Sequence, residues 1–149
     1  MARRIWPEQY LKAGYERARD AQLLLRKERY AHALYTSGVA GECIIHAFRT
    51  LDDAQFDEGH DLMELLKGCD RRRFDGVRNK FDGAVATLRR LWSNDYRYHS
   101  TELVLTRLRK QKLTRGIDGD PVKFYASEAT DAAQTLIKLG RQLWRRETS

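Results

Sequence analysis

Side chains that could bind or cut RNA gather in one eleven-residue segment, Arg89-Arg90-Leu91-Trp92-Ser93-Asn94-Asp95-Tyr96-Arg97-Tyr98-His99. Arginine binds phosphate groups, aromatic rings stack on nucleobases, and an imidazole exchanges a proton near neutral pH. A helix end followed by such a segment indicates an RNA-binding or RNA-cutting site. The alternative is structural, because Trp92, Tyr96 and Tyr98 could simply close one end of the hydrophobic core.

Basic charge is concentrated in the same part of the chain. The 149 residues carry a formal net charge of +7, and residues 89–115 contain eight basic but only two acidic residues. Such an excess attracts an anionic partner, most commonly nucleic acid, although it could also be a solvated helix face. The candidate nucleic-acid-binding residues are Arg89, Arg90, Arg97, Tyr98, His99, Arg107, Arg109 and Lys110.

The other histidines offer weaker candidates for chemistry. Glu42 and His46 are four residues apart on a predicted helix and could chelate a metal, but no second carboxylate–histidine pair completes a bundle-type site. We therefore expect a buried hydrogen bond between them and neither a metal nor a cofactor. His32 lies near a helix start without an evident partner, and His60 is expected to cap or pack at the start of a short helix.

The segment from Tyr30 to Phe48 is the predicted central helix. Its apolar residues repeat at three- and four-residue steps and also occupy the other faces, which is typical of a buried helix. Gly38 and Gly41 lower its intrinsic helix stability by roughly 1 kcal/mol each. We expect that cost to be offset by the close approach of another helix backbone.

The remaining segments also have helical spacing. A first helix should open at Pro7 and join the central helix through residues 27–29 as an antiparallel hairpin. Further helices are expected over 60–67, over the apolar repeat from Phe74 to Leu91 with Asp70 as its possible cap, and from Pro121 onward. Residues 100–113 also fit the alternation of a strand, and we favour a helix there because the surrounding elements are helical.

These elements predict an all-α fold: an antiparallel helical bundle of four long helices plus one or two short ones, in a single domain spanning residues 1–149. No segment is apolar enough to span a membrane, and the N-terminus lacks the features of a signal peptide. Cys43 and Cys69 suggest reduced thiols. We therefore expect a cytoplasmic protein.

The sequence resembles HEPN domains over nearly its whole length. The opening hairpin YLKAGYERARDAQLLLRKERYAHALYTSGVAGECIIHAF is similar to their first two helices. The stretches GHDLMELLK and LWSNDYRYHS resemble the short "GHDL" helix and the tryptophan-then-Arg-Tyr segment of many members. The resemblance implies a helical bundle of prokaryotic toxin–antitoxin or antiphage systems, often encoded beside a nucleotidyltransferase. Together with the large aromatic residues from Trp92 to Tyr98, it predicts a homodimer.

HEPN ribonucleases carry an Arg-x(4–6)-His motif, and this chain departs from it. Eight residues separate Arg90 from His99, and one separates Arg97 from His99. Only Arg26 and His32 have the required spacing, but they straddle the first hairpin link rather than a late helix. We interpret that match as coincidence.

The resemblance therefore predicts a dimeric HEPN-like module without the standard ribonuclease motif, binding nucleotide, RNA or a partner such as a nucleotidyltransferase. The alternative is a metal-independent endoribonuclease, in which His99 is the general acid or base and Arg90 or Arg97 stabilises the reacting phosphate. A third possibility is a structural partner whose basic face docks an acidic protein.

Overall fold

The computed structural model describes residues 4–54, 56 and 59–148, and every regular element among them is helical. The predicted all-α class is therefore confirmed. Six α-helices and two short 3₁₀ segments follow one another in the order α1 (Pro7–Arg26), α2 (Tyr30–Asp52), α3 (Leu62–Lys67), η1 (Arg71–Phe74), α4 (Arg78–Leu91), η2 (Asn94–Tyr98), α5 (Thr101–Lys110) and α6 (Pro121–Thr148).

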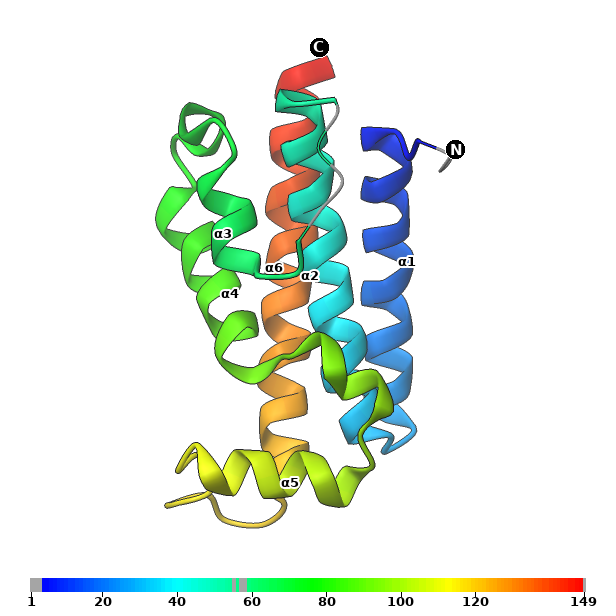
Figure 1. Cartoon of the computed structure of the whole chain (residues 1–149), viewed down its shortest axis with the longest axis vertical. Helices are drawn as coiled ribbons and strands as arrows, with labels where there is room; N and C mark the ends of the chain where they lie inside the picture. The colour runs from blue at the N-terminus through cyan, green and yellow to red at the C-terminus, as the bar shows by residue number, and fades with distance from the viewer. Residues whose placement is uncertain (1–3, 55, 57–58, 149) are drawn as a thin grey trace.

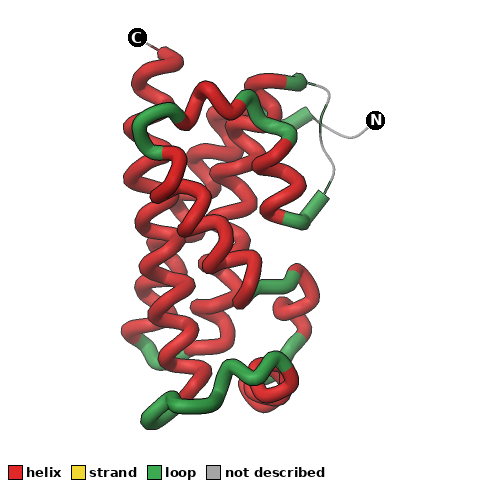
Figure 2. Tube along the Cα trace, turned by 90° about the vertical axis from the view of Figure 1, so that its left-hand side faces the viewer, coloured by secondary structure: helices red, strands yellow, loops and turns green. Residues whose placement is uncertain are grey.

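Four long helices, α1, α2, α4 and α6, run side by side as an antiparallel bundle (Figure 1). The short helix α3 lies against α4, and α5 crosses one end of the bundle. Helix α1 begins and α6 ends at the opposite end from α5, as the rotated view also shows (Figure 2). The bundle therefore has one end that carries α5 and one end that carries the start of α1 and the end of α6.

Helix α2 is the central element that the sequence predicts. It contacts each of the other five α-helices, and thirteen of its 23 residues are buried. It begins at Tyr30 as expected but continues to Asp52, one turn past the predicted end at Phe48. At that end, Phe48 is fully buried and packs edge-on against Phe74 and Trp144.

Gly38 and Gly41 accommodate side chains rather than another helix backbone, which corrects the reason given for them from the sequence. A Cβ atom on Gly38 would lie 2.1 Å from ring atoms of Trp92. A Cβ atom on Gly41 would lie 2.6 Å from Leu88 Cδ1. Both distances are far shorter than carbon–carbon contact, so the two glycines form sockets for residues at the end of α4 and just beyond it.

The close helix approach that the sequence places at Gly38 occurs elsewhere on α2. A Cβ atom on Gly14 of α1 would lie 3.3 Å from the backbone oxygen of Ala40 and 2.7 Å from Ile44 Cδ1. On the other side, a Cβ atom on Gly140 of α6 would lie 3.3 Å from Ile44 Cγ2. Ile44 is thus enclosed between glycines of two neighbouring helices.

Two predicted helix starts are wrong, and local hydrogen bonds and backbone geometry explain why. The short helix begins at Leu62 rather than His60, because the Asp61 carboxylate caps it by accepting from the backbone N–H of the second and third helical residues. Asp70 acts as a cap, as predicted, by accepting from the backbone N–H of Arg72, but it caps only η1, and the long helix α4 begins at Arg78. Gly76, with a φ of 88°, lies between η1 and α4 and interrupts the predicted helix.

Residues 101–110 form a helix, as favoured, and the flanking residues explain its ends. The Ser100 side chain accepts a hydrogen bond from the backbone N–H of Leu103, which caps α5 at its start. Beyond Lys110 the chain turns, and Lys112 adopts a φ of 59°. Asp120 then caps α6 by accepting from the N–H of Val122, in the position that the sequence predicts.

Candidate functional site

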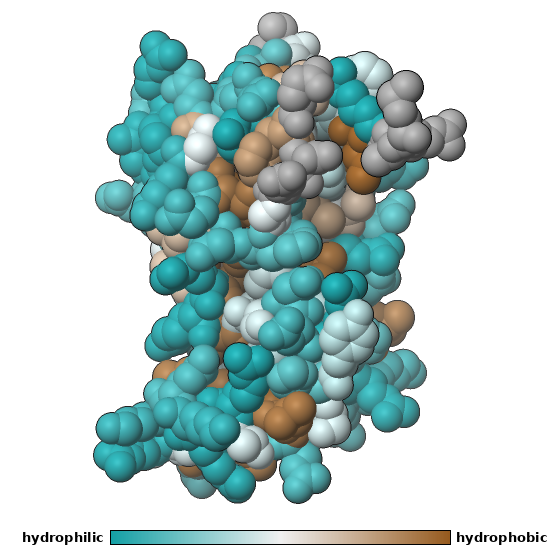
Figure 3. Space-filling model, viewed as in Figure 1, coloured by the Kyte–Doolittle hydropathy of each residue, from teal (hydrophilic) through white to brown (hydrophobic). Residues whose placement is uncertain are grey.

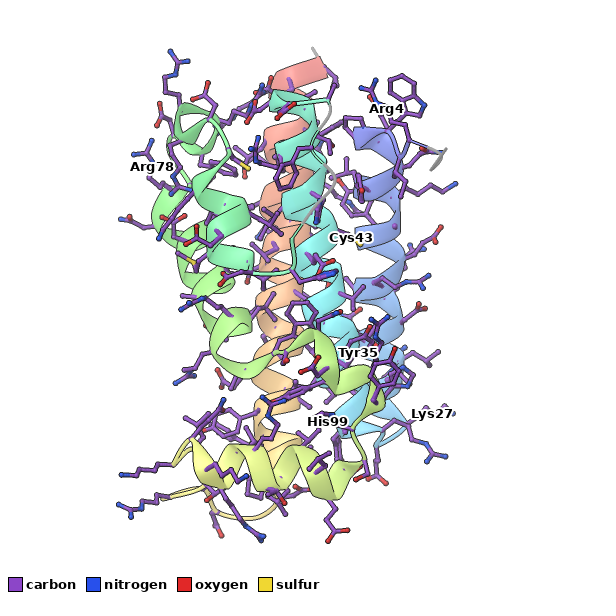
Figure 4. All side chains as sticks on the ribbon, in the orientation of Figure 1. Arg4, Lys27, Tyr35, Cys43, Arg78 and His99 are labelled. Atoms are coloured by element: carbon purple, nitrogen blue, oxygen red, sulfur yellow. The ribbon has the colours of Figure 1, made fainter. Side chains whose placement is uncertain are left out.

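A cavity of about 530 Å³ lies where η2 and the start of α5 pass over the first turns of α2. Figure 4 labels two of its residues, Tyr35 and His99, which lie toward the α5 end of the bundle. We call it the η2 cavity. It is lined by Leu24, Arg29, Ala31, His32, Tyr35, Tyr96, Arg97, His99, Ser100 and Thr101.

The sequence positions η2 through two buried aromatic residues. Helix α4 ends at Leu91, and Trp92, only 8% exposed, enters the socket at Gly38. The Ser93 side chain then accepts from the backbone N–H of Asp95, which starts the 3₁₀ turn. Tyr96 is buried in the middle of the same turn. These anchors hold the residues that follow over the start of α2.

His99 is held by Arg107 from the facing side of α5. Arg107 Nη1 donates a hydrogen bond to His99 Nε2 over 3.2 Å. Because an arginine side chain can only donate, His99 Nε2 is the acceptor in this contact. Nδ1 is buried, and no described residue offers it a hydrogen-bond partner. His99 could act as a base through Nε2 only after Arg107 moves away.

The tyrosines of the cavity remain neutral phenols. Burial raises the pKa of Tyr35, although the nearby Arg97 guanidinium opposes the shift. Burial likewise raises the pKa of Tyr96, against the opposing charge of Arg107, whose guanidinium carbon lies 5.3 Å from the ring centroid. A neutral phenol can donate a hydrogen bond to an anion, so these groups complement the cationic side chains.

The charge of the lining is one-sided. Of the ten residues around the η2 cavity, two are arginines, two are histidines and none is acidic. Arg29 and Arg97 are exposed, so their charges face solvent where a ligand could reach them, and His32 is exposed as well. The surface over α5 at the same end is mostly hydrophilic (Figure 3). This arrangement favours an anionic ligand.

The structure brings together some of the predicted binding residues. Arg97 and His99 line one cavity, and Arg107 contacts His99. Tyr98 is 77% exposed, with the Arg97 guanidinium carbon 4.9 Å from its ring centroid. Trp92 and Tyr96, by contrast, are buried within this chain, which reduces the predicted aromatic surplus to the one exposed tyrosine.

The other predicted binding residues lie outside the η2 cavity. Arg90 does not line it, and Arg89 points to another side of the molecule, where its Nε lies 3.5 Å from a carboxylate oxygen of Asp61. Arg109 and Lys110 are exposed in the last turn of α5. The η2 cavity therefore includes only part of the basic segment that the sequence predicts as a binding site.

Of the lining residues that were not assigned a site from the sequence, Arg29, His32 and Tyr35 have side chains suited to bind an anion or a base. All three come from the hairpin link or the first turns of α2, which lie next to η2 in the fold. A signal for His32 exists in the spacing Arg26-x5-His32. The structure places His32 on the same cavity as His99, although Arg26 is not among the lining residues.

The predicted hydrogen bond between Glu42 and His46 is wrong. His60 Nδ1 donates instead to both carboxylate oxygens of Glu42, at 3.0 and 3.1 Å. His46 Nε2 donates to the backbone oxygen of Gly59 over 3.1 Å, and its ring stacks on Tyr10. Within the described part of the chain, no three histidine, cysteine, aspartate or glutamate side chains are grouped to hold a metal ion.

The two cysteines are free thiols in poorly hydrated surroundings. Burial is the main cause that raises the pKa of Cys43 to about 11 and that of Cys69 to about 12. Neither is activated as a nucleophile, because the thiolate is the reactive form. Among the described helices, none combines the length and apolarity needed to cross a bilayer.

Comparison of the chain with protein-family models, with curated proteins and with solved structures finds no match. The resemblance to HEPN domains thus stays a prediction that depends on the residues and motifs of this sequence.

Proposed function

We propose that this protein is an HEPN-like module that binds the phosphate groups of a nucleotide or of RNA in the η2 cavity. The observation that carries the proposal is the charge of the lining: Arg29 and Arg97 face one cavity that no acidic side chain lines. A phosphate is the common biological anion that such a lining fits, since guanidinium groups bind phosphate oxygens with charge-assisted hydrogen bonds.

The surroundings of the cavity suggest a chain of several nucleotides rather than a free phosphate. Tyr98 presents an exposed ring beside Arg97, where an unpaired base could stack. Arg109 and Lys110 extend the positive charge along α5. A single RNA strand could therefore place one phosphate in the cavity and its neighbours along α5.

The binding test measures affinity for a short labelled RNA over a range of salt concentrations. Each neutralised phosphate of a single strand contributes a slope of about −0.7 in log affinity against log salt. Arg97→Ala should weaken binding of all sequences and flatten that slope. Lys138→Ala removes the same charge from an exposed position on α6, outside the η2 cavity, and should leave the slope unchanged.

Two outcomes would contradict this proposal. One is RNA affinity that does not depend on salt, and the other is equal loss of affinity in the Arg97 and Lys138 variants. In either case, the basic surface would instead favour docking of an acidic protein.

A metal-independent endoribonuclease is the second candidate, because His32 and His99 line the same cavity. One imidazole would take the proton from a ribose 2′-hydroxyl, which attacks the adjacent phosphate. The other would protonate the departing 5′-oxygen, leaving a 2′,3′-cyclic phosphate. Binding ranks first because Arg107 occupies the ring nitrogen that His99 would use.

Cleavage of labelled RNA with metal chelated separates the two candidates. In the binding proposal, the wild-type protein leaves the RNA intact, and His99→Ala barely changes affinity because a neutral imidazole releases no counterion. Cleavage by wild type that is lost in both His32→Ala and His99→Ala, with binding retained, would establish the ribonuclease instead.

We also propose that the module forms a homodimer and pairs with a nucleotidyltransferase in a toxin–antitoxin or defence system. The support for both is the HEPN resemblance, with the exposed Tyr98 as an added apolar surface near η2. Co-purification with the product of a neighbouring nucleotidyltransferase gene, where there is one, would test the pairing.

A further inference from the structure

We infer that a second cavity beside the η2 cavity binds the base of the nucleotide and that guanine is the base it fits best. This inference depends on the proposed phosphate binding in the η2 cavity. The second cavity, which we call the hairpin cavity, has a volume of about 460 Å³ and lies between α1 and α2. It is lined by Arg17, Asp20, Leu23, Leu24, His32, Tyr35, Thr36 and Val39.

The two cavities are neighbours with a shared wall. Leu24, His32 and Tyr35 line both of them. A ligand with its phosphate near Arg97 could therefore reach past Tyr35 into the hairpin cavity. Each volume lies within the range of about 300–1,000 Å³ that small-molecule pockets occupy. The space is appropriate for a nucleotide that extends across the wall.

The two cavities differ in chemistry as the two ends of a nucleotide do. Leucine side chains and Val39 give the hairpin cavity apolar walls, and Leu23 is 48% exposed there. Tyr35 adds an aromatic ring on which a base could stack. The cationic lining of the η2 cavity suits a phosphate, whereas these apolar walls suit the flat face of a base.

Arg17 and Asp20 add polar groups that can read the edge of the base. Arg17 Nε lies 3.3 Å from Asp20 Oδ2, and both side chains are about half exposed, so both can reach a ligand. Guanine presents two adjacent N–H donors, at N1 and N2, next to an O6 acceptor. A carboxylate can accept from both donors while a guanidinium donates to O6. Uracil and cytosine do not present this pattern of two donors and one acceptor.

The test measures binding of the 5′-monophosphates of guanosine, adenosine, cytidine and uridine to the full chain by NMR titration. We expect the guanosine nucleotide to bind at least about tenfold more tightly than the others, which corresponds to one or two charge-assisted hydrogen bonds. Asp20→Asn should abolish that preference while leaving weak binding of all four. The signals of Thr36 and Val39 should shift only with nucleotides and not with inorganic phosphate.

Glu16→Gln is the matched control. Glu16 lies on the same helix and 3.6 Å from Arg17, but it does not line the hairpin cavity, so the guanosine preference should survive. Equal affinity for all four nucleotides, or a preference that persists in Asp20→Asn, would overturn the guanine inference and leave phosphate binding intact. If no nucleotide and no RNA binds, the proposed function itself is wrong.

Discussion

Replacing Gly38 by alanine tests whether Trp92 holds η2 in place. The added Cβ atom would lie 2.1 Å from Trp92 Cδ1 and Cγ. Carbon atoms pack comfortably at about 3.5–4.0 Å, so the ring would have to retreat by about 1.4 Å or more. Trp92 is rigid and 92% buried, and it leads directly into the 3₁₀ turn that carries Arg97. Its displacement should therefore affect both stability and the η2 cavity.

Two opposing effects set the size of the change in stability. Overpacking a core typically costs about 1–3 kcal/mol, and a rigid indole ring places this site near the upper value. Replacing glycine by alanine inside a helix stabilises the helix by about 1 kcal/mol, which offsets part of that cost. The free energy of unfolding should therefore fall by about 2 kcal/mol. For a domain of this size the melting temperature should fall by roughly 4–8 °C.

Gly83→Ala provides the control, because Gly83 is an exposed helical glycine of α4 whose added Cβ atom would meet nothing within 4 Å. The free energy of unfolding of Gly83→Ala should rise by up to about 1 kcal/mol, and the variant should melt slightly above wild type. Thermal unfolding followed by circular dichroism measures both variants. RNA binding should weaken in Gly38→Ala and stay unchanged in Gly83→Ala. A Gly38→Ala variant that melts at or above wild type would refute the socket and the anchoring of η2.

Four further predictions address packing, the two thiols and assembly. Gly41→Leu should lower the free energy of unfolding by roughly 1–3 kcal/mol because its side chain must displace Leu88, and an unchanged melting temperature would contradict this. At pH 8 a disulfide reagent should modify native Cys43 about a hundredfold more slowly than the urea-unfolded chain, since its raised pKa of about 11 suppresses the thiolate. Cys69 should make stability fall as pH rises from 9.0 toward about 12, because the unfolded chain loses that thiol proton first. The decline should be shallower in a Cys69→Ala variant than in wild type, with the remainder due to Cys43, and equal slopes in the two proteins would contradict this. Sedimentation at micromolar concentration should show a dimer, and a single species of 17.4 kDa would contradict it.

The helices could be predicted from the sequence because their signals are local. The start of α2 at Tyr30, the proline at the start of α1 and the Asp120 cap of α6 are each readable within a few residues. The start of α4 was misplaced because apolar spacing continues through η1 to Phe74. The backbone leaves the helical conformation from Asp75 to Val77, with Gly76 at a positive φ, and a single glycine in a sequence does not predict such a conformation.

The candidate site was predictable only in part because it is assembled from distant segments. Arg97 and His99 share one short segment, and their chemistry was evident from residue type. His32 and Tyr35 join them only because Trp92 fills the space above Gly38 and thereby lays η2 across the start of α2. That contact is between a glycine and a tryptophan far apart in the chain. No local pattern of spacing or charge in the sequence predicts this contact between Gly38 and Trp92.

The two ends of the bundle carry different elements, and this has a practical consequence for how the protein can be attached to a surface or label. Helix α1 begins and α6 ends at the end of the molecule opposite α5. An affinity tag, a fluorophore or a biotin attached at the first turn of α1 or the last turn of α6 would therefore lie at the end opposite α5. A sensor chip loaded through such a tag would present the α5 end to the solution. Either position can thus serve as an attachment point without obstructing a ligand in the η2 cavity.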